Sequence, residues 1–305
     1  MSRVLVGADV GGTSTAVVVS DGERVLSRAE GPGAAVRPGR ALVSATTIAE
    51  VARHALALAG HLRCDVLVVG AAGAGRETER EELRQALRGE GFAAQVVVTT
   101  DIEIALAAAY GAGAGIVVSA GTGSIAVARD GAGRLHRVGG YGWQMGDEGS
   151  GYSIGRSALG AVSRAHDGRG GRTELTSRLL AVTRCDNFDA LVRWSAAAMT
   201  SEVAALAPAV IEVAAAGDTL AKGVADYAAR ELAQLVLHLL PHFGENERQI
   251  VPVATNGRLL VRDGLLYAMV RTKLEEDPRI KLLGESIDPP MGAVRLAVES
   301  VSGKS

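Results

Sequence analysis

Aromatic side chains and cysteines are scarce in this 305-residue chain, and each scarcity excludes a class of function. Aromatic residues make up 3% of the chain, too few for the stacking platforms that bind single-stranded nucleic acids. The two cysteines, Cys64 and Cys185, are far apart in sequence, and neither belongs to a C-x-x-C pair. This spacing argues against a disulfide framework, a four-thiolate zinc site and a self-contained iron–sulfur cluster.

An excess of one charge and long hydrophobic runs are also missing. The chain has 32 Lys and Arg against 34 Asp and Glu, so we expect no basic surface for nucleic acids or membranes. No apolar run reaches the ~18 residues of a membrane span. The first apolar stretch contains Asp9 and follows no basic segment, unlike a signal peptide. With 48% hydrophobic and 22% charged residues, the chain is predicted to be a folded cytoplasmic protein.

The most informative feature of the sequence is an internal repeat. Residues 4–22 (VLVGADVGGTSTAVVVSDG) and 115–131 (GIVVSAGTGSIAVARDG) each contain a Gly-Thr pair and, at the same spacing, an Asp-Gly pair. β-Branched runs joined by Gly-rich and Asp-Gly turns predict antiparallel strands. The repeat therefore predicts two copies of one β-rich unit.

Each copy of the repeat continues into alternating structure. In the first copy we expect helices at 41–59, 77–88 and 102–110, and strands at 65–70 and 95–100. In the second copy a helical region at 151–240 comes before strands at 249–254 and 279–283 and a closing helix at 292–301. This order predicts an α/β protein with mixed sheets and domains at 1–114 and 115–305. We expect the closing helix to pack back on the first domain.

The two Gly-Thr turns have the chemistry of a phosphate site. Glycine lets backbone N–H groups approach an anion because it has no Cβ. Thr13 and Thr122 add a hydroxyl donor at corresponding places. Two such turns in a duplicated protein predict a nucleoside triphosphate held by two lobes.

Several motifs together resemble a known family. Residues 9–13 (DVGGT) resemble the first phosphate motif of the sugar kinase, hsp70 and actin superfamily, and residues 121–123 (GTG) resemble the second. Residues 139–150 (GGYGWQMGDEGS) resemble the signature of the BadF/BadG/BcrA/BcrD ATPase family and the related N-acetylglucosamine kinases; the segments TTD, SAGTGS and MGA at 99–101, 119–124 and 291–293 also fit. The resemblance implies a two-domain actin-like ATPase (ribonuclease H-like) fold with duplicated βββαβαβα domains and a helical insertion in the second.

The resemblance also implies a role for individual residues in an ATP-dependent, Mg²⁺-dependent sugar kinase. Asp9 would position the magnesium ion, and Asp101 would take the proton from the sugar hydroxyl. The phosphate contacts would be Gly11, Gly12, Thr13, Gly121 and Thr122. The sugar contacts would be Gly123, Ser124, Gly140, Tyr141, Gly142 and Asp147. The adenosine would lie near Ala214, Asn256 and Gly257.

The chain departs from the family pattern at two places. Residues 254–257 read ATNG where the family usually has a Gly-Gly pair. The loop at 31–38 (GPGAAVRP) lacks the Asn with which N-acetylglucosamine kinases contact sugar hydroxyls. The resemblance implies the 6-hydroxyl of N-acetylglucosamine as acceptor, and the missing Asn leaves glucosamine and N-acetylmuramic acid as alternatives. A homodimer is also left open.

Three alternatives compete with these interpretations. Taken alone, Asp101 predicts an N-cap for a helix starting at Ile102. The segment GYSIG at 151–155 matches the nucleophile elbow of α/β-hydrolases, although MGDEGS before it does not predict the buried strand that an elbow needs. The third alternative is an ATP-hydrolysing activator of another protein. Family members of that kind hold an iron–sulfur cluster with cysteines, and Cys64 and Cys185 do not match that context.

Overall fold

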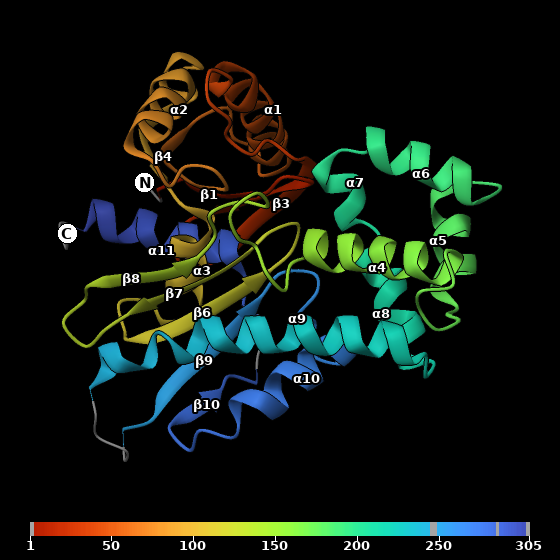
Figure 1. The fold of residues 1–305 in the computed structure, drawn as a ribbon. Coiled ribbons are helices and arrows are strands. Elements are labelled where there is room, and N and C mark those ends of the chain that lie inside the picture. The colour runs from red at the N-terminus through yellow and green to blue at the C-terminus, as the bar shows by residue number, and fades with distance from the viewer. Residues whose placement is uncertain (1–2, 245–248, 285–286, 303–305) are drawn as a thin grey trace. The chain divides into compact units, whose positions relative to one another are not determined.

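The structure of the protein is a computed structural model that describes residues 3–244, 249–284 and 287–302 (Figure 1). The chain forms two compact units. The first consists of residues 1–113 together with 287–305, and the second of residues 114–286. The closing helix therefore belongs to the first unit although it ends the chain.

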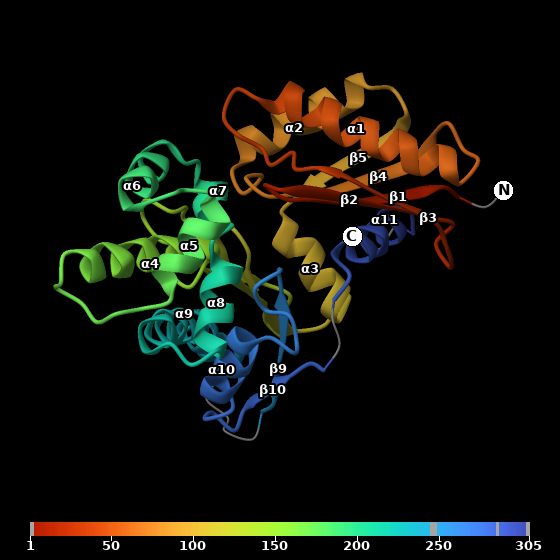
Figure 2. The same ribbon diagram turned by 90° about the vertical axis from the view of Figure 1, so that its right-hand side faces the viewer.

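The first unit is built on a five-stranded sheet in the order β3-β2-β1-β4-β5. The strands β1, β2 and β3 are antiparallel neighbours, and β4 and β5 run parallel to β1. Figure 2 shows α1 and α2 on one face of this sheet and α3 and α11 on the other. The bounds are β1 Leu5–Val10, β2 Ser14–Ser20, β3 Val25–Pro32, α1 Ala41–Leu58, β4 Cys64–Ala71, α2 Glu77–Gly89, β5 Ala93–Thr99, α3 Asp101–Tyr110 and α11 Pro289–Val301.

The second unit repeats this sheet and adds helices to it. Its strand order, β10-β9-β6-β7-β8, is the first order read backwards, with the same parallel and antiparallel pairs. The predicted duplicated α/β architecture with a helical insertion is therefore confirmed. The bounds are β6 Gly115–Ala120, β7 Ser124–Arg129, β8 Leu135–Gly139, α4 Gly151–His166, α5 Leu175–Thr183, α6 Phe188–Ala197, α7 Thr200–Ala204, α8 Ala207–Ala215, α9 Thr219–Leu237, the 3₁₀ helix η1 Leu240–Phe243, β9 Val251–Asn256, α10 Leu265–Leu274 and β10 Ile280–Leu282.

The duplication extends to the hydrogen bonds of the Asp-Gly turns. Asp21 Oδ1 accepts the N–H groups of the residues two and three positions later, at 2.9 and 2.7 Å. Asp130 Oδ1 accepts those two and four positions later, both at 2.9 Å. A short Asp side chain stabilises a turn in this way because it replaces a backbone acceptor. The repeated Asp-Gly pairs thus end equivalent strands, β2 and β7.

The MGA segment of the sequence holds α11 against the first sheet. A Cβ at Gly292 would lie 1.9 Å from the carbonyl oxygen of Ile104 in α3. A Cβ at Gly7 of β1 would lie 2.3 Å from the carbonyl oxygen of Pro290. Both glycines are therefore needed for backbones to approach closely, which gives the motif a packing role.

The helix α1 has the length and mean hydropathy of a membrane span, although Glu50 and Arg53 interrupt its apolar residues. The helices α7–α8 and α9–η1 reach that length and hydropathy only as a pair bent by 119°. Half of α1 is buried, however. Its residues Ala45, Ile48, Ala49 and Ala52 belong to the core cluster that β1 and β2 also form. We therefore interpret α1 as a core helix.

Candidate active site

The first Gly-Thr turn joins β1 to β2 and presents an open backbone. The Gly11 N–H donates to the Ser14 carbonyl at 2.9 Å, and Gly12 and Thr13 are exposed. The loop after β3 supports the turn from one side: the Ala34 N–H donates to the Gly11 carbonyl at 3.1 Å. A Cβ at Gly33 would lie 2.4 Å from the Gly12 carbonyl group. The loop at 31–38, which lacks the expected Asn, therefore positions this turn through its backbone.

Asp9 lies at the end of β1, on the face that α3 and α11 cover. Leu5 packs among the buried residues of those helices, and alternation along a strand puts Gly7 and Asp9 on the same face. Burial first, and then the charges of Asp101 and Asp288, raise the pKa of Asp9 to about 7. Three carboxylates therefore concentrate negative charge here, which disfavours ionised Asp9 unless a cation is present.

Asp101 is the first residue of α3, directly after β5. The N-cap of this helix is Thr100, whose hydroxyl oxygen accepts the Glu103 N–H at 3.3 Å. The interpretation of Asp101 as an N-cap is therefore wrong, because Thr100 has the extended backbone of a cap and closes a capping box with Glu103. The Asp101 carboxylate instead accepts the Ile102 N–H at 3.0 Å.

The second Gly-Thr turn is supported on several sides by the rest of its unit. The Gly121 N–H donates to the Gly123 carbonyl at 2.9 Å, and the Gly121 carbonyl accepts the Gly151 N–H at 2.8 Å. The start of α4 is thus attached to the turn. On another side, Gly257 has a φ of +91°, and a Cβ there would lie 2.3 Å from the Ala120 carbonyl oxygen. Only glycine fits that position without strain.

The loop at 140–150 brings Asp147 onto the second turn. A Cβ at Gly123 would lie 2.8 Å from Asp147 Oδ2, so the carboxylate lies directly beside this glycine. Burial raises the pKa of Asp147, while the N–H groups of Ser124 and Gly142, which donate to it, act in the opposite direction. Asp147 also has a φ of +64°, which is uncommon for a residue other than glycine. Strained polar residues of this kind cluster at functional sites.

The other predicted sugar contacts lie on the same loop. The Ser124 hydroxyl donates to the Glu148 carbonyl at 2.6 Å, which fastens the loop to β7. Tyr141 is 66% exposed, and the guanidinium of Arg137 lies 5.0 Å from the centre of its ring. Gly140 has a φ of +72° and packs against Ile125. The structure therefore brings the predicted sugar-binding residues of two segments together, those at 123–124 and those on the loop at 140–150.

A cavity of about 150 Å³ contains two of the three residues predicted to lie near adenosine. Asn256 and Gly257 line it, and the Asn256 amide donates to the Ser119 hydroxyl at 3.3 Å. Ala214 does not line this cavity: it is fully buried in α8, within the core of the second unit. The lining residues that sequence reasoning missed are Thr255, Leu260, Val261, Arg262, Tyr267, Leu283 and Gly284.

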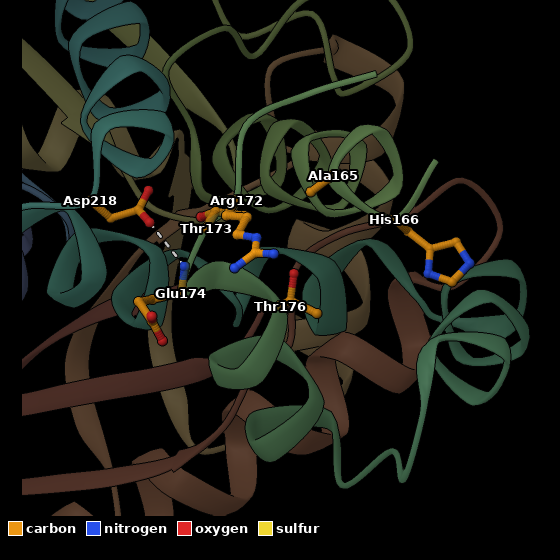
Figure 3. A pocket seen from close by; sticks show the side chains of 7 residues that line it. All are labelled: Ala165, His166, Arg172, Thr173, Glu174, Thr176 and Asp218. Atoms are coloured by element: carbon orange, nitrogen blue, oxygen red, sulfur yellow. Dashed lines mark hydrogen bonds between the residues drawn. The ribbon is translucent and has the colours of Figure 1, made fainter. Parts of the chain in front are cut away.

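A second cavity, of about 420 Å³, lies among the helices of the insertion (Figure 3). Asp218 at the start of α9 accepts the Glu174 N–H at 2.9 Å, and His166 lies at the opposite end of the view. The lining residues are Ala165, His166, Arg172, Thr173, Glu174, Thr176 and Asp218. None of them is a predicted site residue.

The hydrolase interpretation of the GYSIG segment is wrong. Ser153 lies in the first turn of α4, which follows a loop and not a buried strand, and its N–H donates to the Ser150 hydroxyl oxygen at 3.2 Å. A Cβ at Gly155 would lie 2.1 Å from the Val203 carbonyl oxygen. The glycines of this segment therefore allow α4 to pack closely on α7.

Comparison with known proteins agrees with this geometry. The BadF/BadG/BcrA/BcrD ATPase family matches residues 6–297 of the chain. The chain belongs to this family. An N-acetylmuramic acid/N-acetylglucosamine kinase from Clostridium acetobutylicum is 31% identical over 237 residues, 77% of each chain. An N-acetyl-D-glucosamine kinase from Dictyostelium discoideum is 32% identical over 189 residues, 61% of this chain and 59% of that one.

A solved structure extends the match to nearly the whole chain. The crystal structure of a proposed N-acetylglucosamine kinase from Chromobacterium violaceum superposes with a TM-score of 0.80 at 28% identity and covers 96% of this chain and 98% of the other. The fold is thus the actin-like ATPase fold. The chain is an ATP-binding phosphotransferase of the amino-sugar kinase kind.

Proposed function

We propose that this protein transfers the γ-phosphoryl group of MgATP to the 6-hydroxyl of N-acetylglucosamine, giving N-acetylglucosamine 6-phosphate and ADP. The observation that carries the proposal is the position of Asp101 at the carboxyl end of β5, in the same unit as Asp9 and the first Gly-Thr turn. Parallel strands of α/β proteins place their ligands at that end. The amino-sugar kinases among its relatives support the choice of acceptor.

In this proposal Asp101 is the general base. Its carboxylate accepts the proton of the 6-hydroxyl while that oxygen forms a bond to the γ-phosphorus and the bond to the leaving ADP oxygen breaks. Phosphoryl transfer depends mainly on positioning and charge stabilisation. The backbone N–H group of Gly12 and the hydroxyl groups of Thr13 and Thr122 supply that stabilisation at the phosphates, and Gly11 and Gly121 let the backbone approach them.

The residues around Asp9 fit a magnesium ion. Burial first, and then the negative charges of Asp101 and Asp288, raise the pKa of Asp9, and a bound divalent cation would favour its ionised carboxylate. Within the described ranges, no three His, Cys, Asp or Glu side chains lie close enough to bind a metal by themselves. Asp9, with Asp101 near it, offers the one or two carboxylates that Mg²⁺ takes before water and substrate phosphates complete its shell. When bound, the ion would neutralise charge on the phosphates.

The second unit would supply most of the recognition. Gly123, Ser124, Gly140, Tyr141, Gly142 and Asp147 bind the sugar, and the cavity at Asn256 and Gly257 takes the adenosine in this proposal. The apolar side chains that line this cavity suit a purine ring. Because the substrates are a free amino sugar and ATP, we place the reaction in the cytoplasm.

One observation favours N-acetylmuramic acid as a second acceptor. This sugar carries a carboxylate that N-acetylglucosamine lacks, and the exposed guanidinium of Arg137 is fixed beside Tyr141 by a hydrogen bond from its Nε to the Gly139 carbonyl at 2.9 Å. Arginine pairs well with a carboxylate because its planar fork offers several donors. Arg137→Gln should therefore reduce use of the acidic sugar more than use of the neutral one.

The test is ADP release measured with N-acetylglucosamine, glucosamine, N-acetylmuramic acid and glucose. Release that depends on an N-acetylated hexosamine, and that falls in Asp101→Asn, supports the proposal. Release that is equal with and without any sugar would instead indicate the ATP-hydrolysing activator. Activity with glucose alone would contradict the amino-sugar assignment.

A further inference from the structure

Glu103 accepts an unusual set of hydrogen bonds around the proposed base. Its Oε2 accepts the Thr100 N–H at 3.0 Å, the Thr100 hydroxyl at 2.7 Å and the hydroxyl of Thr99. In return, the Glu103 N–H donates to Thr100 Oγ1 at 3.3 Å. One carboxylate oxygen therefore connects the last residue of β5, the N-cap and the first turn of α3.

This arrangement goes beyond what helix capping requires. A capping box needs only the two reciprocal bonds between the N-cap residue and the residue three positions later. Two further bonds reach Glu103 here, from the Thr100 and Thr99 hydroxyls, and the bond from Thr99 attaches the end of the strand to the helix. Asp101 is the residue between these attachment points, and its own carboxylate accepts the Ile102 N–H. The backbone on both sides of Asp101 is thus fixed.

Glu103 serves in this way as an anion. Burial alone would raise its pKa, but the hydrogen bonds from Thr99 and Thr100, with the positive charge of Arg80, together hold the pKa of this carboxyl below its usual value. An ionised carboxylate is an acceptor only, so one oxygen can receive several donors at once. Donors that point at an anion make stronger hydrogen bonds than those between neutral groups.

We propose that Glu103, through Thr99 and Thr100, is a positioning residue that holds Asp101 in the orientation needed to accept the sugar proton. The proposal rests on the proposed function of Asp101 as the base. Its physical reason is that proton transfer requires the base to lie within hydrogen-bond reach of the hydroxyl. A misplacement of about 1 Å at a reacting group can cost roughly 10²-fold in rate.

The decisive variant is Thr99→Val, which keeps the size of the side chain and the whole capping box but removes the bond from the strand to Glu103. We expect kcat to fall about tenfold, less than the roughly 10²-fold loss for a displacement of about 1 Å. The KM for ATP should stay within about twofold, because Thr99 contributes to no proposed nucleotide contact. Thr99→Ser, which restores the hydroxyl, should recover most of the parent kcat. Glu103→Ala, which removes all three bonds that the Glu103 carboxylate accepts, should lower kcat further.

Asn187→Ala provides the matched control. Asn187 caps α6, accepting the Ala190 N–H at 2.9 Å, and lies in the helical insertion. Loss of a cap of this kind should lower Tm without changing kcat. If Glu103→Ala behaves like Asn187→Ala, and Thr99→Val leaves kcat unchanged, Glu103 is only a cap and the proposal is wrong.

A double variant separates this proposal from the proposed function. If Thr99 acts through the base, Thr99→Val should have no further effect on kcat in an Asp101→Asn background. Two independent, multiplicative losses would overturn the positioning role and leave Asp101 as the base. No loss of kcat in Asp101→Asn alone would instead contradict the proposed function.

Discussion

The two Gly-Thr turns have the same backbone design but different surroundings. The turn at 11–13 is supported by a single loop, through Gly33 and Ala34, and leaves Gly12 exposed. The turn at 121–123 is held by the start of α4, by Gly257 and by the Asp147 carboxylate. Both copies of the repeat have therefore kept a glycine turn with donors, which a phosphate needs, while the segments that support the two turns have become different.

The charge at the two turns differs in the same way. Asp9 lies two residues before the first turn, next to the last paired residue of β1. Ser119 has the same position in β6, next to its last paired residue. Ser119 is neutral and accepts a hydrogen bond from the Asn256 amide. In the proposed function, the first unit thus carries the carboxylates that take part in the chemistry, and the second unit carries the loop and the cavity that recognise the substrates.

The largest effect expected from this division concerns the base in the first unit. Asp101→Asn keeps the size of the side chain but removes a group that takes a proton at neutral pH. We expect kcat to fall by about 10²–10⁴, the range for a positioned acid–base group. The Tm should change little, because Thr100 caps the helix. Turnover within a few-fold of the parent, measured by ADP release, would move the search for the base to Asp147.

The next largest effect compares the two turns directly. A Cβ at Gly12 or at Gly121 would meet no atom within 4 Å, so alanine fits both positions in the protein itself. Any need for glycine must therefore come from a ligand. Gly12→Ala and Gly121→Ala should each raise the KM for ATP by about 10²-fold, since displacing donors from a charged phosphate costs roughly 1.5–3 kcal/mol per bond.

The Tm values of Gly12→Ala and Gly121→Ala should match that of the parent protein. Gly257→Ala is the contrasting variant, because its Cβ would collide with the Ala120 carbonyl, and it should lower Tm as well. An unchanged KM in both Gly12→Ala and Gly121→Ala would mean that phosphate does not approach these turns.

Much of the fold could be predicted from the sequence because its signals are local. The repeat, the Asp-Gly turns and the alternation of strands and helices all lie within short segments. The cap of α3 could also be predicted, since Thr100 and Glu103 form the S/T-x-x-E pattern, which the alternative interpretation of Asp101 as a cap leaves out. The cavity residues Leu283 and Gly284 were not predictable, because their segment meets residues 255–257 only after β10 pairs with β9.

A smaller effect is expected from the hydroxyl groups of the turns. Thr13→Val and Thr122→Val each remove one donor and leave the backbone unchanged. A hydrogen bond to a charged group is worth about 1.5–3 kcal/mol, so each change should raise the KM for ATP about tenfold. Initial rates across a range of ATP concentrations would measure this. If only Thr122→Val had an effect, the first turn would contribute backbone donors alone.

The smallest effect is on stability and isolates the charge that distinguishes the first turn from the second. Burial, then Asp101 and Asp288, raise the pKa of Asp9 to about 7 from an ordinary value of 3.8. Between these pH values the folded protein binds more protons than the unfolded chain, so the free energy of unfolding falls as pH rises and levels off above pH 7.

Asp9→Asn stays neutral and avoids this loss of stability, which is on the order of a few kcal/mol at ~1.36 kcal/mol per pKa unit. We therefore expect Asp9→Asn to raise Tm by about 5 °C at pH 8 in the absence of MgATP and by much less at pH 4.5. MgATP should stabilise the parent protein more than the variant, because the ion needs the carboxylate. Equal shifts of Tm at both pH values would show that the Asp9 charge does not set the difference between the two turns.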